Sequence, residues 1–211
     1  LVPAPPRALA GVVIGGLMQR VRAALAILAL ALVLVLPGAT LAVDAPSPPG
    51  DGELVRVIEV TDGDTIRVEW PDGWWERVRY IGIDTPEISH EPDGRDEPWG
   101  REATEANRDL VGGQRVLLER DVSDTDRYDR LLRYVWVETD DGWVMVNGEL
   151  VAAGMADVRA YEPDTRHHDW FRQLQDEARD AGRGMYGDGE SDDQSEESGI
   201  VERFLDFIGW D

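Results

Sequence analysis

The sequence of 211 residues contains neither cysteine nor lysine. Without cysteine the chain forms no disulfide, no zinc–thiolate site and no cysteine nucleophile. All 21 basic residues are arginine, and 43 acidic residues bring the formal net charge to −22. Dense surface carboxylates keep a protein hydrated and soluble at high salt, so the composition predicts a halophilic protein. The alternative is an ordinary acidic protein in which arginine replaces lysine.

The excess of negative charge argues against partners that are themselves polyanions, because like charges repel at long range. Two effects reduce that repulsion for nucleic acid. At about 1 M salt the Debye length is only about 3 Å. A bound divalent cation also reverses the sign of the local charge inside a site. Composition alone therefore does not exclude a nucleic-acid substrate.

Acidic residues are absent from positions 1–42. There, Arg20 and Arg22 precede a 14-residue apolar run at positions 23–36, followed by a Pro-Gly pair and small residues. A membrane span needs about 20 apolar residues, and this shorter pattern is typical of a secretory signal peptide. We expect residues 1–42 to be a signal peptide of a secreted protein, with Met18 as the true start. An uncleaved membrane anchor is the alternative.

Composition divides the remainder of the chain into four segments. A Pro/Gly-rich linker is expected at 43–52, and a globular domain at 53–187. Residues 188–199 are rich in acids and predict a disordered tether. Residues 200–211 carry apolar side chains at helical spacing, which predicts a short amphipathic tail helix that docks on the domain or on an unknown partner.

Within the globular segment, alternating apolar and polar residues predict five strands, and apolar residues at a period near 3.6 predict three helices. The strands are expected at Leu54–Thr61, Ile66–Trp70, Trp74–Ile83, Arg115–Asp121 and Leu131–Glu138. The helices are expected at Gly100–Val111, Val146–Ala153 and Asp169–Ala181. Five strands with three helices indicate an α+β domain, and closing the strands into a barrel would leave no free sheet edge.

Carboxylates stand at the ends of two of these strands. Asp64 lies in the turn before the second strand, and Asp84 lies at the end of the third. If the strands are neighbours, these oxygens and the Thr85 carbonyl offer Ca²⁺ the ligands that it prefers. Glu87 is three residues past Asp84, within reach of a water that it could position or deprotonate. This pattern predicts a metal-assisted hydrolytic site.

Two arginines accompany the carboxylates. Arg79 lies on the third strand, and Arg130 ends the loop at 126–130, whose sequence is Asp-Arg-Tyr-Asp-Arg. A guanidinium group stays charged at every working pH and donates two parallel hydrogen bonds to phosphate oxygens. Carboxylates that bind a cation, combined with arginines that bind phosphate, predict hydrolysis of a phosphodiester.

Each motif has a plain structural interpretation when it is taken singly. The turn at 62–65 is a common hairpin turn, and the segment at 84–87 resembles a helix cap. The acids of the loop region at 121–129 fit a solvated acidic face. The eight tryptophans, Trp74 and Trp75 among them, are most simply explained as core or hairpin packing.

Together the motifs carry a specific resemblance. The segment from Leu54 to Gly187 resembles the staphylococcal nuclease-like (thermonuclease) family through five stretches, which are at residues 62–65, 79–87, 99–103, 126–130 and 146–154. The resemblance implies a five-stranded OB-fold β-barrel with three helices. It also implies a Ca²⁺-dependent nuclease, acting as a monomer on DNA and RNA with low sequence specificity, that leaves 3′-phosphate products.

Roles follow from the resemblance position by position. It implies calcium ligands at Asp64, Asp84 and Thr85, and catalytic residues at Arg79, Glu87 and Arg130. It implies contacts with the substrate phosphate and nucleotide at Arg127, Tyr128 and Tyr161. One departure is Asp129, because the family usually has glycine there. A non-catalytic OB-fold module that binds nucleic acid is the alternative function.

Overall fold

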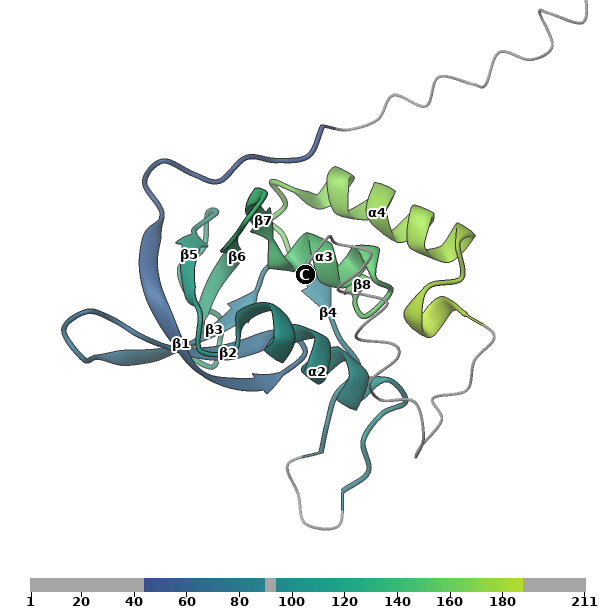
Figure 1. Ribbon diagram of the computed structural model, residues 1–211, viewed down its shortest axis with the longest axis horizontal. Coiled ribbons are helices and arrows are strands. Elements are labelled where there is room, and N and C mark those ends of the chain that lie inside the picture. Colours follow the sequence, from purple (N-terminus) through teal and green to yellow (C-terminus); the bar gives the residue numbers. More distant parts are fainter. Residues whose placement is uncertain (1–43, 90–93, 188–211) are drawn as a thin grey trace, which may run out of the picture. The chain divides into compact units, whose positions relative to one another are not determined.

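The computed structural model describes residues 44–89 and 94–187 (Figure 1). The predicted signal peptide, the acidic tether and the tail helix lie outside the described residues. In the described part of the chain, no helix is both long enough and apolar enough to cross a membrane.

Five strands close into a barrel around one hydrophobic core. The sheet has the order β3-β2-β1-β5-β6-β7, and a further pairing of β3 with β6 closes the barrel. That closing pair is parallel, whereas the other pairs are antiparallel. The five barrel strands are β1 (Glu53–Asp62), β2 (Thr65–Glu69), β3 (Trp75–Tyr80), β5 (Arg115–Glu119) and β6 (Leu131–Thr139). The predicted five-stranded barrel is confirmed, and β7 (Gly142–Met145) extends β6 as a hairpin.

The alternation of the strand sequences explains which side faces the core. On β2 and β3, the side chains of Ile66, Val68 and Val78 are fully buried, whereas Trp75 and Arg77 between them are exposed. Successive side chains of a strand point to opposite faces. The inner side of the barrel is therefore apolar, and its outer side carries the charges.

Three helices cover one side of the barrel. They are α2 (Gly100–Val111), α3 (Val146–Ala152) and α4 (His168–Asp180), and a 3₁₀ turn, η1 (Gly184–Tyr186), follows them. Helix α2 contacts β1, and α3 lies between α2 and α4 (Figure 1). The buried face of α2 contains Ala103, Ala106 and Leu110, at the spacing that the sequence predicts.

Two fully buried asparagines attach these helices to the strand ends that carry the site. Asn107 of α2 donates to the Asp62 carbonyl at 2.9 Å and accepts from the Tyr80 hydroxyl at 2.9 Å. Asn147 of α3 donates to the Ile81 carbonyl at 2.9 Å and accepts from the Val135 N–H at 2.9 Å. Because a buried polar group left unpaired is costly, these bonds fix the two helices against the chain on either side of the site.

The third predicted strand is too long. It ends at Tyr80 rather than Ile83, because Gly82 has a φ of 81° and turns the chain. Beyond that turn, β4 (Ile83–Asp84) pairs with β8 (Asp157–Val158), a two-residue strand that the sequence did not predict. This small pair brings the segment after α3 alongside Asp84.

Candidate active site

The turn between β1 and β2 holds Asp64 in one position. The Asp62 carboxylate accepts from the Asp64 N–H at 3.1 Å, and the Thr65 hydroxyl donates to Asp64 Oδ1 at 3.1 Å. A Cβ atom at Gly63 would lie 2.6 Å from Thr85 Oγ1, so this close approach requires glycine. Asp64 itself is only 2% exposed. The turn is thus a preformed support for a buried carboxylate and not only a hairpin connection.

The end of β4 meets this turn. The Thr85 N–H donates to Asp64 Oδ2 at 3.1 Å, which joins two of the three predicted metal ligands directly. Asp84, the third, is half-buried on β4. The predicted convergence of the two strand ends is therefore present in the structure.

Arg79 lies between the two carboxylates. Its guanidinium nitrogens are 2.6 Å from Asp64 Oδ2 and 2.9 Å from Asp84 Oδ1. The same group donates to the carbonyls of Tyr80 and Ile83, at 3.2 and 3.0 Å. The side chain is only 12% exposed. Such a network fixes the guanidinium at the end of β3 and leaves it few orientations.

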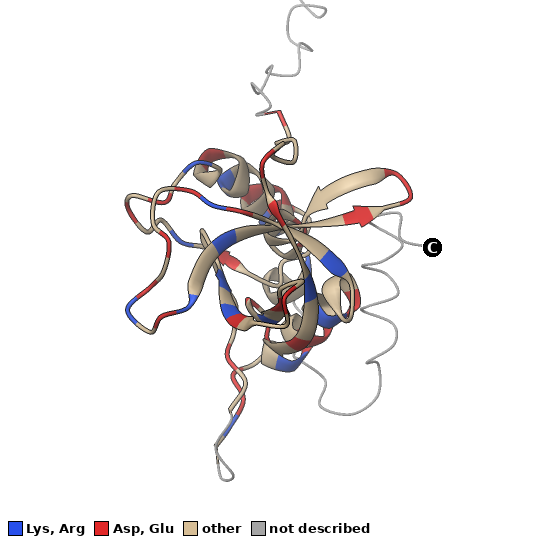
Figure 2. Cartoon of the chain, turned by 90° about the vertical axis from the view of Figure 1, so that its left-hand side faces the viewer, with Lys and Arg blue, Asp and Glu red and all other residues tan. Residues whose placement is uncertain are grey.

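Negative charge exceeds positive charge around Arg79. Burial raises the pKa of the Asp64 carboxyl; Arg79 opposes that rise, and the negative charge of Asp62 adds to it. Partial burial also raises the pKa of Glu87, and the charges of Asp62 and Asp84 raise it further. Acidic and basic segments are interspersed over the strands and loops seen in Figure 2. The excess of carboxylates around the Arg79 guanidinium favours the binding of an additional cation.

The donors present fit a hard divalent cation. Across residues 44–89 and 94–187, no three histidine, aspartate or glutamate side chains gather as a metal cluster. The predicted set instead combines two carboxylates with the Thr85 carbonyl. These are oxygen donors only, as Ca²⁺ requires, and its remaining coordination positions can be filled by water.

Glu87 lies on the exposed loop that follows β4. Its N–H donates to the Glu97 carboxylate at 3.1 Å, and its carbonyl accepts from the Glu97 N–H at 2.9 Å. The first residue of α2 packs beneath it, since a Cβ atom at Gly100 would lie 2.6 Å from the Glu87 carbonyl oxygen. The glycine in the stretch at 99–103 therefore lets α2 position Glu87.

The loop at 126–130 is organised by Asp126. Its Oδ1 accepts from the N–H groups of Tyr128 and Arg130, at 2.8 and 3.0 Å. Its Oδ2 lies 2.8 Å from Arg130 Nε and 2.7 Å from Arg130 Nη2. The interpretation of Asp126 as part of a solvated acidic face is therefore wrong. This carboxylate holds both the loop and the arginine that the loop carries.

Asp129 occupies the position where the family usually has glycine, and its φ is 58°. Only glycine adopts this left-handed conformation without strain, although aspartate tolerates it better than most residues. The ion pair of Arg130 is formed with Asp126. The loop therefore keeps a turn of the kind that glycine would allow, at some conformational cost.

Five of the predicted residues surround one hollow of about 430 Å³. These are Arg79, Arg127, Tyr128, Arg130 and Tyr161. The guanidinium carbons of Arg127 and Arg130 lie 4.7 and 5.5 Å from the centre of the Tyr128 ring. A larger hollow of about 560 Å³ is lined by none of the predicted site residues. The smaller one combines arginines and exposed aromatic rings, which suits a nucleotide.

Sequence reasoning missed two residues near this hollow. Asp126 was missed although an aspartate that accepts the N–H two residues further on is a common turn device. Arg159 was missed because it reaches the site only through the β4–β8 pair. Its Nε lies 3.5 Å from Asp84 Oδ2, so Asp84 contacts guanidinium groups on both of its oxygens.

Comparison with known proteins agrees with this geometry. Residues 77–188 match the family model described as "Staphylococcal nuclease homologue". The chain is 38% identical to a thermonuclease of Staphylococcus hyicus over 124 residues, which are 59% of this chain and 70% of that protein. It is 39% identical to a thermonuclease of Staphylococcus intermedius over 128 residues, covering 61% and 73%.

A similar match joins it to endonuclease YncB of Bacillus subtilis, with 39% identity over 138 residues, 64% of this chain and 63% of the relative. These relatives are nucleases by name, and the residues that the family model matches include Arg79 and Arg130. The chain thus belongs to the staphylococcal nuclease family.

Proposed function

We propose that this protein is a secreted, Ca²⁺-dependent nuclease that hydrolyses phosphodiester bonds of DNA and RNA and leaves 3′-phosphate ends. The position of Arg79 carries the proposal. Its guanidinium contacts the carboxylates of Asp64 and Asp84, and it also lines the hollow that Arg130 and Tyr128 share. A phosphate bound there would meet a cation site and two arginines at once.

The residues have separate roles in the proposed reaction. Asp64, Asp84 and the Thr85 carbonyl would hold Ca²⁺. When bound, the cation would neutralise charge on the phosphoryl oxygens and polarise a water molecule. Arg79 and Arg130 would bind the phosphate and stabilise the charge that develops in the transition state. Burial raises the pKa of the Glu87 carboxyl, which makes its carboxylate a stronger base. Glu87 would accept a proton from the attacking water.

Low sequence specificity follows from the kinds of groups that line the hollow. The arginines present donors suited to phosphate, which is common to every nucleotide. Tyr128 and Tyr161 are both 55% exposed and offer ring faces on which any base can stack. We therefore propose cleavage of both DNA and RNA.

Secretion rests on the sequence at 1–42 and is tested by sequencing the N-terminus of the exported protein, which should then begin at Val43 or Pro46.

The activity is tested by incubating the purified protein with single- and double-stranded DNA and RNA, first with Ca²⁺ and then with a chelator. Asp64→Asn and Asp84→Asn should lower cleavage by at least about 100-fold. Asp176→Asn, an exposed aspartate of α4, is the matched control. Fragments with 3′-phosphate should resist extension by a polymerase until a phosphatase is added. Tight binding without cleavage, unchanged by the chelator, would instead indicate the non-catalytic module.

A further inference from the structure

The outer side of β3 leads from the site to the tip of the β2–β3 hairpin. Arg79, Arg77 and Trp75 alternate with the buried Val78 and with Glu76, so all three share the outward side of the strand. Each two-residue step advances about 6.6–6.8 Å. A row of two arginines and one tryptophan therefore extends for about 13 Å from the proposed catalytic arginine.

Arg77 connects this row to the nucleotide hollow. Its Nη2 donates to the carbonyl of Tyr128 at 3.0 Å. Within the described ranges it forms no ion pair, so most of its N–H groups remain available to a ligand. Tyr128 in turn lines the hollow with Arg130. The row and the hollow are thus one continuous surface.

Trp75 is held at the far end of the row by a third arginine. The guanidinium carbon of Arg67, on β2, lies 4.7 Å from the centre of the Trp75 ring, and Glu59 of β1 holds the same guanidinium at 2.7 Å. Trp75 nevertheless remains 53% exposed, and the adjacent Trp74 is 66% exposed. These two tryptophans are therefore not core residues, and Trp75 packs on the hairpin through Arg67 while one part of its ring stays exposed.

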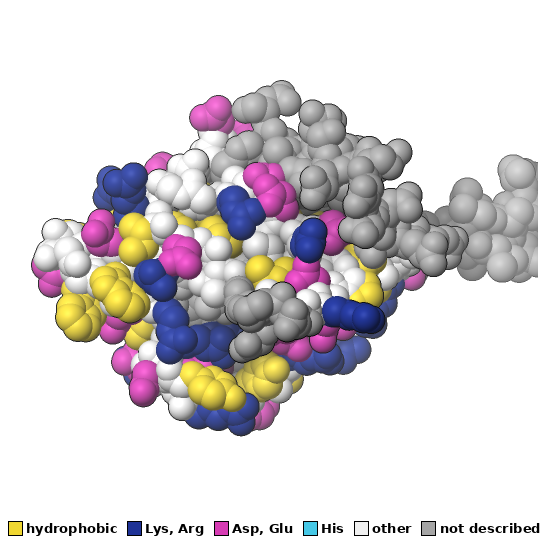
Figure 3. Space-filling view, turned by 90° about the horizontal axis from the view of Figure 1, so that it is seen from below, with side chains coloured by type: hydrophobic (Ala, Val, Ile, Leu, Met, Phe, Trp, Pro, Cys, Tyr) yellow, Lys and Arg dark blue, Asp and Glu magenta, His cyan; other side chains and the backbone are white. Residues whose placement is uncertain are grey.

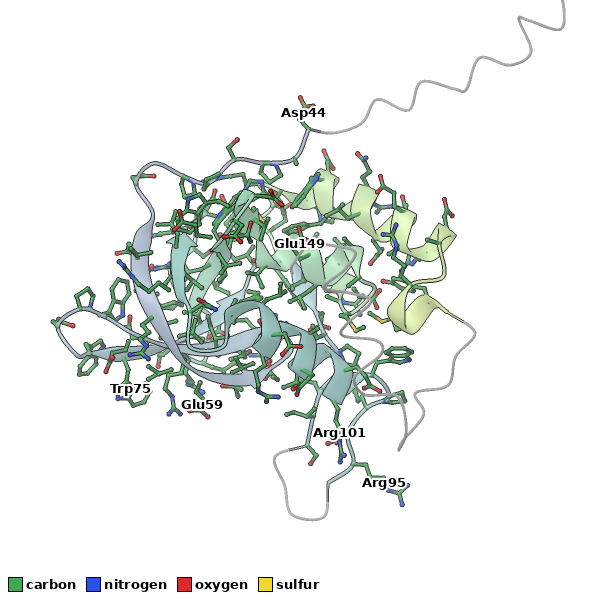
Figure 4. All side chains as sticks on the ribbon, viewed as in Figure 1. Asp44, Glu59, Trp75, Arg95, Arg101 and Glu149 are labelled. Carbon is green, nitrogen blue, oxygen red and sulfur yellow. The ribbon has the colours of Figure 1, made fainter. Side chains whose placement is uncertain are left out.

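The figures place this surface at one end of the barrel. Figure 4 shows Trp75 and Glu59 near each other, beside the hairpin that projects from the barrel. Figure 3 shows hydrophobic side chains gathered at that end, next to several arginine side chains. An exposed group of aromatic rings and arginines is unexpected on so acidic a protein unless it serves a ligand.

We propose that the outer side of β3, from Arg79 to Trp75, binds the single strand that continues from the bond being cleaved. The inference rests on the proposed nuclease function and extends it. Arg77 binds a backbone phosphate beyond the scissile one, and a base stacks on Trp75. In a duplex the base faces are already stacked on each other, so Trp75 favours single strands. Glu69, which pairs with Trp75 across the hairpin, and Glu59 repel the negatively charged nucleic acid. Base stacking on Trp75 therefore contributes more to binding at this end of the row than charge does.

Binding of labelled oligonucleotides in the presence of a chelator tests the proposal, because no cleavage then occurs. The probes are a dinucleotide, a single-stranded 10-mer and a duplex of the same sequence. Trp75→Ala should weaken binding of the 10-mer by about 5- to 150-fold and leave the dinucleotide unchanged. Trp75→Tyr should retain most of the affinity, since it keeps a ring. Arg77→Ala should reduce the salt dependence of 10-mer binding by about one unit of slope, whereas Arg172→Ala, an exposed arginine on α4, should not.

The outcomes separate this inference from the function on which it rests. Equal 10-mer affinity of the wild type and Trp75→Ala, with Ca²⁺-dependent cleavage intact in both, would contradict strand binding along the outer side of β3. The proposed nuclease function would be unaffected. An equal loss of affinity for duplex and single strand would overturn the stacking role of Trp75. If the wild type neither binds the 10-mer nor cleaves it, both proposals fail. Thermal unfolding of each variant checks that the barrel is unchanged.

Discussion

The guanidinium of Arg79 lies 2.6 Å from the Asp64 carboxylate, in the place where the charge of a cation is needed. It also contacts Asp84 at 2.9 Å. One arginine therefore partly neutralises the two carboxylates among the three predicted metal ligands before any metal binds. The same group is expected to compete with the cation for these oxygens and then to bind the phosphate.

The competition gives a measurable prediction. Arg79→Ala should bind Ca²⁺ at least about threefold more tightly than the wild type, because a positive charge next to both carboxylates is removed. Calorimetric titration of the two proteins measures the change. The variant should at the same time be inactive. Weaker binding of Ca²⁺ by the variant would show that Arg79 supports the cation site rather than competing with it.

Asp126 should act on cleavage through Arg130. Asp126→Asn keeps the size of the side chain but loses the charged pair with the guanidinium, so we expect kcat to fall by about 10- to 100-fold with little change in Tm. Asp176→Asn, at an exposed position of α4, is the control. An unchanged kcat would mean that Arg130 is positioned by the loop backbone alone.

Asp129 should be replaceable by glycine but not by a β-branched residue. At a φ of 58°, glycine relieves strain, so Asp129→Gly should leave the free energy of unfolding unchanged or raise it by up to about 1 kcal/mol. Asp129→Val should lower it by about 1–2 kcal/mol. Chemical denaturation measures both. Equal stability of the valine variant and the wild type would contradict the observed turn.

The titration of Glu149, which is labelled on α3 in Figure 4, should make the free energy of unfolding depend on pH. Burial raises the pKa of its carboxyl from 4.5 to about 7. The folded state therefore holds this proton more tightly than the unfolded chain does. Its contribution to stability is complete below about pH 4.5, and it is lost as the pH rises through about 7.

Glu149→Gln removes that titration. The variant should match the wild type near pH 4 and exceed its free energy of unfolding by about 1–3 kcal/mol at pH 9. Denaturation at several pH values measures the difference, and Glu138→Gln, at an exposed position of β6, is the control. A constant difference across this range would show that folding does not raise the pKa of Glu149.

Much of this fold is local in origin and was predictable from the sequence. The helix Gly100–Val111 has its predicted bounds, and the strand predicted at Ile66–Trp70 lies one residue earlier, at Thr65–Glu69. The pair formed by β4 and β8 was not predictable, because two-residue strands carry no period and their partners are 73 residues or more apart. Arg159, which depends on that pair, was missed for the same reason.

The candidate site was likewise predictable only in part. Each chemical group was visible in the sequence, since Asp64, Asp84, Arg79 and Arg130 stand in short motifs. Their mutual contacts were not visible, because the 2.6 Å approach of Arg79 to Asp64 depends on the register of β2 with β3. The exposure of Trp75 likewise depends on how far the hairpin projects beyond the barrel. The halophilic character and the secretion of the protein stay predictions.

The central claim is that the carboxylates and arginines gathered at the end of β3 form a phosphodiester-cleaving site. The most direct test is the initial rate of single-stranded DNA cleavage at saturating Ca²⁺ for the wild type, Arg79→Ala, Arg130→Ala and the control Arg172→Ala. We predict that each of the first two variants loses at least about 100-fold, that the control stays within about twofold, and that a chelator abolishes cleavage by all. Cleavage by Arg79→Ala at the wild-type rate would contradict the account.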